Sequence, residues 1–210
     1  MLGSVSLSES RDKWSWGIDE GGEFTVSNVK KLLREDRDIH REHVMNWESW
    51  VPLKVNLHMW RAEMDRVPTR LELVRRRINI PDVSCVLCNT DPESSMHTFT
   101  GCGFTYGVWS FVEKWCRLDP IIAFDVKDLL LLPDSVRGPK WAKKIIRGII
   151  MTSCWAVWRA RNDKAFEGVI PKVNEVFATI KSLSFLWLRS RSKFKTIQWK
   201  DWMVFPLYML

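Results

Sequence analysis

The sequence predicts a mainly α-helical protein that is interrupted by one short segment rich in cysteine and turn-forming residues. Over most of the chain, apolar residues recur every three or four positions, which is the spacing that places them on one face of a helix. With 210 residues, 46% of them hydrophobic, the chain can bury a substantial core. Short strands are expected only near residues 15–26, around Gly21-Gly22, and at the turn of Cys85.

Three helices are expected before the cysteine-rich segment. Ser27 is a suitable N-cap for the first, which runs through Leu33. The second begins near Pro52 and ends at Pro68. Its expected buried face consists of Leu53, Leu57, Trp60 and Met64. The third opens with Thr69-Arg-Leu-Glu72, the pattern of a capping box in which each of the two side chains bonds the other residue's N–H. It is expected to turn Leu71, Val74 and Ile78 inward and the arginines at 75–77 partly outward.

Further helices are expected after the cysteine-rich segment. One carries an apolar face of Phe104, Val108, Val112 and Trp115. Asp125 is expected to cap a short helix through Leu132. Residues 140–167 form the longest expected helix, and its two neighbouring apolar stripes indicate burial over much of the circumference. Another helix starts at Pro171, with apolar positions Val173, Val176, Ile180, Leu183 and Trp187.

The most informative pattern of the chain is Cys85-x2-Cys88-x8-His97-x4-Cys102. Zn²⁺ binds thiolate sulfur and imidazole nitrogen, and structural zinc sites use four such protein ligands in a tetrahedron. The spacing therefore predicts one structural zinc ion held by Cys85, Cys88, His97 and Cys102. With all four positions filled, no open position remains for a catalytic water. The alternative is that these residues are neighbours in the sequence by accident.

Residues around this motif support a tight metal turn. Asn89 tolerates the left-handed backbone that such a turn often needs. Gly101 and Gly103 are expected to let the backbone wrap closely around the metal. His97 is expected on a short helix that begins at residue 94 or 95.

Positive charge is concentrated in the last third of the chain. Residues 141–210 contain 13 Lys and Arg against 4 Asp and Glu, while the whole protein carries a net charge of +7. The same third holds six of the 13 tryptophans. Cations contact phosphates and aromatic rings stack on unpaired bases, so this composition favours RNA or single-stranded DNA as a partner. The candidate contacts are Arg75, Arg76, Arg77, Arg189, Arg191, Lys193 and Lys195.

These cations also have a plainer interpretation. The first three are equally compatible with a solvated helix surface. The last four would suit the negative C-terminal end of a helix dipole. On composition alone, neither interpretation is excluded.

Several classes of protein are disfavoured. No apolar run is long enough to span a bilayer, and residues 1–11 lack the pattern of a signal peptide. The 5 cysteines are an odd number, and three of them belong to the metal motif, which favours a reducing compartment over a disulfide framework. Cys116 and Cys154 are expected to be core thiols. We therefore expect an intracellular protein, nuclear or cytoplasmic and not secreted, with no membrane partner and no small-molecule substrate.

Several short motifs follow one another along the chain. Trp14-Ser-Trp16 precedes Gly22-Glu-Phe24-Thr-Val26, and Trp50-Val-Pro52-Leu-Lys54-Val55 precedes Trp60-Arg61. Val67-Pro68-Thr69, with Leu73 and Arg76, leads to the metal motif and Trp109. Trp155-Ala-Val-Trp158-Arg159-Ala160-Arg161-Asn162 with Phe166, and then Trp199-x2-Trp202-x3-Pro206, complete the series. Taken together, residues 14–206 resemble the reverse transcriptase zinc-binding domain of plant non-LTR retrotransposons and the segment that often follows it. The chain departs from that family's pattern at Val86, Thr98 and Gly103, and none of these is a ligand.

The resemblance implies the C-terminal piece of a retroelement reverse transcriptase polyprotein. The expected organisation is a loose leader at 1–13, the zinc-binding domain at 14–132, a linker at 133–140 and a basic, Trp-rich helical region at 141–210. Polymerases of this class hold two metal ions with paired aspartates, and the sequence contains no Asp-Asp. No acidic cluster for RNA cleavage is recognisable either. We therefore expect no polymerase or endonuclease activity from this chain alone, although the family is one of RNA-directed DNA polymerases.

Two functions are left open by the sequence. In the first, the chain is a zinc-stabilised module that binds RNA or single-stranded DNA. In the second, it is a structural or protein-interaction module, a decayed or host-adopted retroelement fragment. Its tryptophans would then form core, or an interface to a polymerase domain or another retroelement protein. The tryptophans concerned are Trp141, Trp155, Trp158, Trp199 and Trp202.

Overall fold

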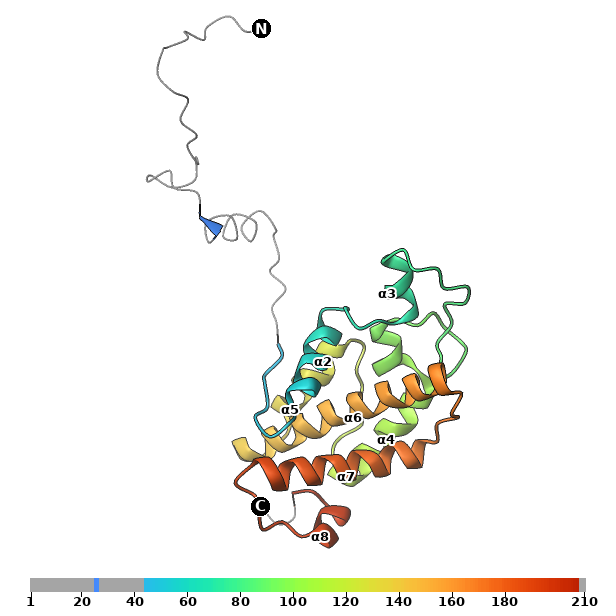
Figure 1. Ribbon diagram of the computed structural model, residues 1–210. Coiled ribbons are helices and arrows are strands. Elements are labelled where there is room, and N and C mark those ends of the chain that lie inside the picture. The colour runs from blue at the N-terminus through green and yellow to red at the C-terminus, as the bar shows by residue number, and fades with distance from the viewer. Residues whose placement is uncertain (1–24, 27–43, 208–210) are drawn as a thin grey trace, which may run out of the picture. The chain divides into compact units, whose positions relative to one another are not determined.

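The computed structural model describes residues 25–26 and 44–207, and nearly all regular structure in them is helical (Figure 1). The chain divides into two units, residues 1–42 and 43–210. Of the first unit only Thr25 and Val26 are described, and Val26 is helical, where the sequence suggested a strand. The leader, the rest of the expected strands near 15–24 and the helix expected from Ser27 lie outside the described residues.

Two long helices form the centre of the second unit. α6 (Lys140–Glu167) and α7 (Val173–Arg191) lie side by side and run in opposite directions (Figure 1). α2 (Leu53–Glu63) and α5 (Val126–Ser135) pack against α6, and α4 (Gly103–Cys116) packs against α7. The remaining elements are α3 (Arg70–Arg75), the π-helical turn η1 (His97–Gly101) and α8 (Trp199–Val204). No helix in the described part of the chain is long and apolar enough to cross a membrane.

The mainly helical fold class is confirmed, and α6 has the bounds that its periodicity predicted. Both of its apolar stripes are buried, including Ile145, Ile149 and Val157. The helix ends where Gly168 takes a left-handed conformation with φ 69°, a backbone that glycine adopts without steric cost. The one strand-like pairing among residues 44–207 is an isolated bridge between Ser84 and Pro92, at the turn where a strand was expected.

α2 buries a different face from the one predicted. Leu53, Leu57 and Trp60 are 64%, 40% and 37% exposed, whereas Val55 and Met59 are completely buried. The apolar stripe was therefore placed on the wrong side of this helix.

The reason is a buried polar residue, Asn56. Its side chain accepts a hydrogen bond from the N–H of Glu48 at 3.0 Å and donates to the carbonyls of Glu48 and Val51 at 3.1 and 3.0 Å. Buried backbone groups need such partners, so an amide occupies a position that apolar patterning assigns to solvent.

α3 is shorter than expected. Thr69 caps it by accepting from the N–H of Glu72 at 3.4 Å, but the Glu72 carboxylate pairs with Arg75 and completes no capping box. Val74 and Ile78 are 43% and 47% exposed, so the inward placement of these two was wrong. The helix stops because the chain turns into a left-handed conformation at residue 77, with φ 62°.

The second unit has one core that both halves of the sequence share. α5 has the expected cap, a capping box of Asp125 and Asp128, but it continues through Pro133 to Ser135. The first residues of the expected linker are therefore helical. Trp50, from the expected zinc-binding domain, lies against Gly148 of α6, and both belong to the same packed interior.

Candidate metal centre

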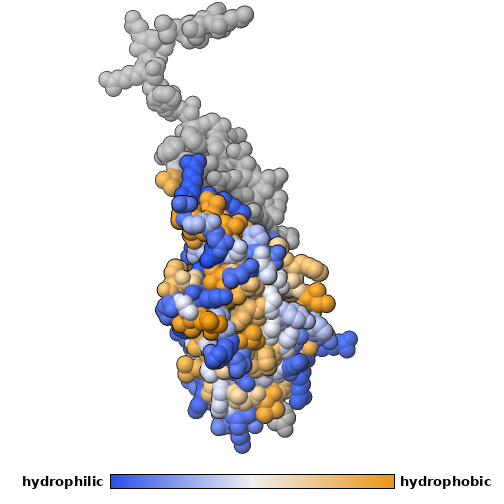
Figure 2. Space-filling view, turned by 90° about the vertical axis from the view of Figure 1, so that its right-hand side faces the viewer, coloured by the Kyte–Doolittle hydropathy of each residue, from blue (hydrophilic) through white to orange (hydrophobic). Residues whose placement is uncertain are grey.

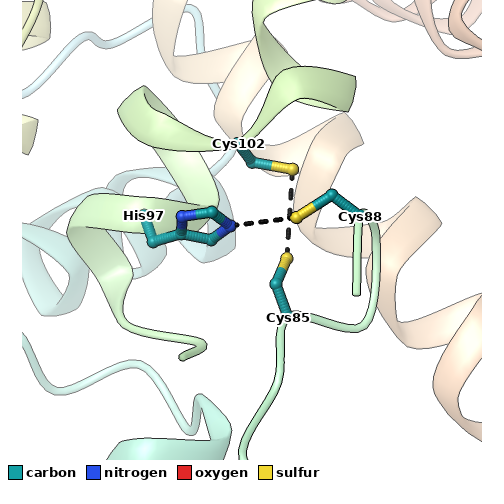
Figure 3. A group of neighbouring side chains, drawn as sticks. All are labelled: Cys85, Cys88, His97 and Cys102. Carbon is teal, nitrogen blue, oxygen red and sulfur yellow. Dashed lines mark hydrogen bonds between the residues drawn. The ribbon is translucent and has the colours of Figure 1, made fainter. Parts of the chain in front are cut away.

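The four residues of the cysteine–histidine motif meet at one point (Figure 3). The three Sγ atoms and a ring nitrogen of His97 all lie within 4.8 Å of one another. Cys85 Sγ is 3.9 Å from Cys102 Sγ, and Cys88 Sγ is 3.2 Å from His97 Nε2. In a tetrahedral site with metal–sulfur distances of ~2.3 Å, two ligand atoms stand about 3.8 Å apart. The donor set and its spacing therefore fit one zinc ion.

Cys85 and Cys88 come from one tight turn. The N–H of Asn89 donates to the carbonyl of Cys85 at 2.8 Å, and Asn89 takes the expected left-handed backbone with φ 58°. The amides of Leu87 and Cys88 form hydrogen bonds with the Cys85 sulfur. Such donors favour the thiolate, which is the form of cysteine that binds a metal.

His97 and Cys102 are brought into line by the π-helical turn η1. The helical segment begins at Ser95, as the sequence suggested, and Ser94 Oγ accepts from the N–H of His97 at 3.0 Å. A π-helical turn joins residues five apart in the sequence, and His97 and Cys102 are five apart. The His-x4-Cys spacing therefore places both ligands on the same side of this turn. Trp109 Nε1 donates to the carbonyl of Phe99 at 2.8 Å and ties the turn to α4.

The N-terminus of α4 stabilises negative charge on Cys102, which is the N-cap residue of that helix. The S–H of Cys85 donates to Cys102 Sγ, and this hydrogen bond lowers the pKa of Cys102, as do the amides of Phe104 and Thr105. The same hydrogen bond, together with burial, raises the pKa of Cys85. The pair therefore loses its first proton readily, which favours metal binding because the ligands must be deprotonated.

The ring of His97 has a defined orientation. Its Nε2 faces the sulfurs, and its Nδ1 lies 3.7 Å from Asp91 Oδ2. A carboxylate beside the distal nitrogen favours the tautomer in which Nε2 is free to bind a metal.

The glycines beside Cys102 do not have the role expected of them. A Cβ at Gly101 would lie 3.5 Å from His97 Nδ1, an ordinary contact, and one at Gly103 would meet nothing within 4 Å. Neither residue has a left-handed backbone. The prediction was wrong because the special backbone conformation is supplied by Asn89 alone within the motif.

Two charged residues beside the centre were missed by sequence reasoning. Glu93 is completely buried, and Arg161 of α6 is 4% exposed. Arg161 follows Val157 by one helical turn on a buried stripe of α6. A cation at such a position needs a buried partner, and this was the available signal.

Cys116 and Cys154 lie outside the metal cluster. They are 2% and 0% exposed, and burial raises the pKa of both thiols. The expectation that they are core thiols is confirmed.

The seven predicted nucleic-acid contacts fall into two groups at opposite ends of the unit (Figure 1). Residues 75–77 adjoin α3 at the metal end, and the four cations from Arg189 to Lys195 lie at the C-terminal end of α7. All seven are exposed. On the face shown in Figure 2, which views the metal end, polar and apolar side chains are interspersed.

The two groups differ in their electrostatic partners. Arg75 pairs with Glu72 and lies 3.6 Å from Asp65, and Arg76 Nη2 donates to the carbonyl of Arg66 at 3.1 Å. At the end of α7, none of the four cations takes part in an ion pair among residues 44–207.

Of the five tryptophans assigned to core or interface, Trp199 is the exposed one, at 42%. Its ring packs edge-on against Phe185 at 5.1 Å, and Arg189 lies 5.8 Å from the same Phe185 ring. We call Arg189, Arg191, Lys193, Lys195 and Trp199 the basic end.

The fold and the site define a helical domain in which four side chains could hold one metal ion, and comparison with known proteins shows what part of it is similar to. Residues 24–109 match the family described as zinc-binding in reverse transcriptase, and all four ligand residues lie inside this match. That segment is therefore similar to the zinc-binding domain of reverse transcriptases. A relative from Arabidopsis thaliana, named a putative ribonuclease H protein, is 28% identical over 105 residues, which are 48% of this chain but 17% of the relative. No solved structure matches the chain.

Proposed function

We propose that this chain is a zinc-stabilised module that binds RNA or single-stranded DNA and belongs to a retroelement reverse transcriptase. The observation that carries the proposal is the basic end, where four exposed cations have no ion-pair partner in the described chain and the exposed indole of Trp199 packs against Phe185, the ring that Arg189 also contacts. Free cations attract phosphates, and a base stacked on an aromatic ring contributes about 1–3 kcal/mol. The family match supports it, because reverse transcriptases act on nucleic acids.

The zinc ion has a structural role in this proposal. Cys85, Cys88, His97 and Cys102 would fill all four positions of a tetrahedral site, so the ion would hold residues 85–102 in shape. In small zinc modules the apparent binding free energy is about 10–16 kcal/mol, which exceeds the stability of most domains.

We assign no polymerase or ribonuclease site to this chain. The sequence has no Asp-Asp, and the match to the Arabidopsis relative covers 17% of that protein. The activity that the relative's name gives is therefore not carried over.

Nucleic-acid binding can be tested by fluorescence anisotropy with labelled single-stranded RNA, single-stranded DNA and duplex DNA over a series of KCl concentrations. We expect single strands to bind more tightly than duplex, with log K falling by about 0.7 per phosphate contact for each unit of log[salt]. Replacing all four basic-end cations by Gln should remove up to about 3 from that slope. Trp199→Ala should weaken binding roughly 5- to 100-fold without changing the slope.

The matched comparison is the triple variant Arg75→Gln, Arg76→Gln and Arg77→Gln. We expect it to lose less affinity, because Arg75 and Arg76 already have acidic or carbonyl partners. Affinity that does not depend on salt, or a basic-end variant that binds like the wild type, would contradict the proposal.

A protein-interaction module is the second candidate. Exposed apolar side chains on α2, such as Leu53, and in the loop before α5, where Ile122 and Phe124 are 74% and 78% exposed, favour contact with a protein such as a polymerase domain. Self-association of the purified chain in light scattering, without retention of nucleic acid, would favour this candidate over the first.

A further inference from the structure

We propose that Glu93 and Arg161 position the metal turn, residues 85–89, which carries Cys85 and Cys88. The last turns of α6 then form part of the metal centre, although they lie outside residues 24–109, the segment that matches the family. Arg161 is 52 residues beyond the end of that match, at residue 109. The inference rests on the metal binding in the proposed function and is independent of nucleic-acid binding.

The Glu93 carboxylate joins three elements. Arg161 Nε donates to Oε1 at 2.9 Å and Arg161 Nη2 donates to Oε2 at 2.6 Å, which is the parallel, two-bond geometry of the strongest ion pairs. The N–H of Arg70, the first residue of α3, donates to Oε2 at 2.9 Å. The N–H of Val86, which lies between Cys85 and Cys88, donates to Oε1 at 3.4 Å.

A second bond from α6 reaches the next residue of the metal turn. Lys164 Nζ donates to the carbonyl of Leu87 at 3.2 Å. Lys164 follows Arg161 by three positions, so both side chains leave the same face of α6. The two residues between the paired cysteines, Val86 and Leu87, are therefore both held through this face.

The other half of the centre also rests on α6. Trp158 packs against Phe99 of η1 with 6.4 Å between ring centroids, and the Arg161 guanidinium lies 5.0 Å from the Trp158 ring. Phe99 is two residues from His97, and Val86 is next to Cys85. One face of α6 thus supports both the turn that supplies two sulfurs and the turn that supplies the imidazole.

Both partners of the Glu93–Arg161 ion pair are buried, so we expect its loss to disturb the metal turn. Glu93 is 0% and Arg161 4% exposed, and removing either partner leaves the other charge buried without compensation. The turn would then move to rehydrate it. Coupling is reciprocal, so zinc binding should in turn hold the C-terminal part of α6 in place.

The test compares zinc affinity of full-length variants by competition with a chromophoric chelator, and records the absorption spectrum of the Co²⁺-substituted proteins. Arg161→Met should weaken zinc binding by about 10- to 100-fold and alter the Co²⁺ ligand-field bands. Arg161→Lys, which keeps the charge but not the two-bond fork, should recover part of the affinity. The matched control is Arg159→Met, an exposed arginine on the same helix, which should behave as wild type.

Two further measurements apply if Arg161→Met does not fold. Lys164→Met removes only the bond to Leu87 and should weaken zinc binding severalfold. In the wild type, chelation should increase amide hydrogen exchange at residues 157–167 more than at residues 145–155.

The outcomes separate the two claims. A wild type that binds no zinc overturns both the metal part of the proposed function and this inference. A wild type that binds zinc overturns this inference alone if the Arg161 and Lys164 variants match Arg159→Met in affinity and Co²⁺ spectrum. Equal hydrogen exchange with and without zinc at residues 157–167 would also overturn it.

Discussion

The metal centre and the basic end differ in what holds their functional groups. At the metal centre, four side chains converge within 4.8 Å, and neighbouring helices fix the turns that carry them. At the basic end, the cations project into solvent and none pairs with another described residue through an ion pair. A site whose side chains must all bind one metal ion can thus be inferred from their spacing along the chain. A surface site depends on where distant helices place its charges.

The largest expected effect concerns a cysteine inside the centre compared with one outside it. Cys102→Ser should abolish stoichiometric zinc binding and unfold residues 85–102, because about 10 kcal/mol or more of binding free energy is at stake. Cys116→Ser changes a thiol that is equally buried but outside the cluster, and should keep one zinc while losing about 1–3 kcal/mol of stability. Metal analysis and denaturant unfolding measure both. Zinc retained by Cys102→Ser would remove the distinction between the two cysteines.

A smaller effect is expected in the packed region of α6 between the two ends. A Cβ at Gly148 would lie 1.9 Å from Trp50 Cζ2, and Trp50 is 4% exposed, so its ring has no free space to enter. Gly148→Ala should lower the free energy of unfolding by about 3 kcal/mol. Gly103→Ala, which meets no atom within 4 Å, is the control and should not destabilise the protein. Equal melting temperatures for the two variants would show that this contact is not rigid.

His58 provides a pH-dependent comparison close to the metal centre. Burial among Phe99, Trp155 and Trp158 lowers its pKa from 6.5 to about 4. Between pH 6.5 and 4, His58 is protonated in the unfolded chain but neutral in the folded chain. The free energy of unfolding therefore falls as the pH drops from 6.5 towards 4. We expect a loss of about 2 kcal/mol near pH 5 from this residue.

The contribution of His58 is obtained as the difference between the wild type and a variant that lacks the imidazole. His58→Phe should be less sensitive to acid than the wild type by about that amount in denaturant unfolding at neutral and acidic pH. If the free energies of unfolding of the wild type and His58→Phe fall by the same amount between neutral and acidic pH, His58 is not buried in the neutral form.

The smallest effect on stability is expected at the basic end. Arg189→Gln and Arg191→Gln should each change the free energy of unfolding by no more than about 0.5 kcal/mol, because both side chains are exposed. The same variants should weaken binding of single-stranded nucleic acid in salt titrations. A loss of stability without a loss of binding would assign these cations a purely structural role.

The parts of the molecule that could be predicted from the sequence are those in which the determining residues are close together. The ligand motif lies within 18 residues, and α6 has an apolar pattern broad enough to fix its length. The buried face of α2 could not be predicted, because Asn56 is there to bond the backbone of a preceding loop. The partner of Glu93 could not be predicted either, since Arg161 is 68 positions away and only the packing of α6 brings it near.

The unbroken length of α6 determines how far apart the two groups of candidate nucleic-acid contacts lie. The helix has 28 residues and no break, so at about 1.5 Å per residue it keeps its two ends roughly 42 Å apart. Its last turns adjoin the metal centre and α3, and its first turn adjoins the loop after α7, where Trp141 contacts Phe194. A single-stranded nucleic acid that touches the arginines at 75–77 and the lysines at 193 and 195 at once would therefore have to extend over roughly 40 Å.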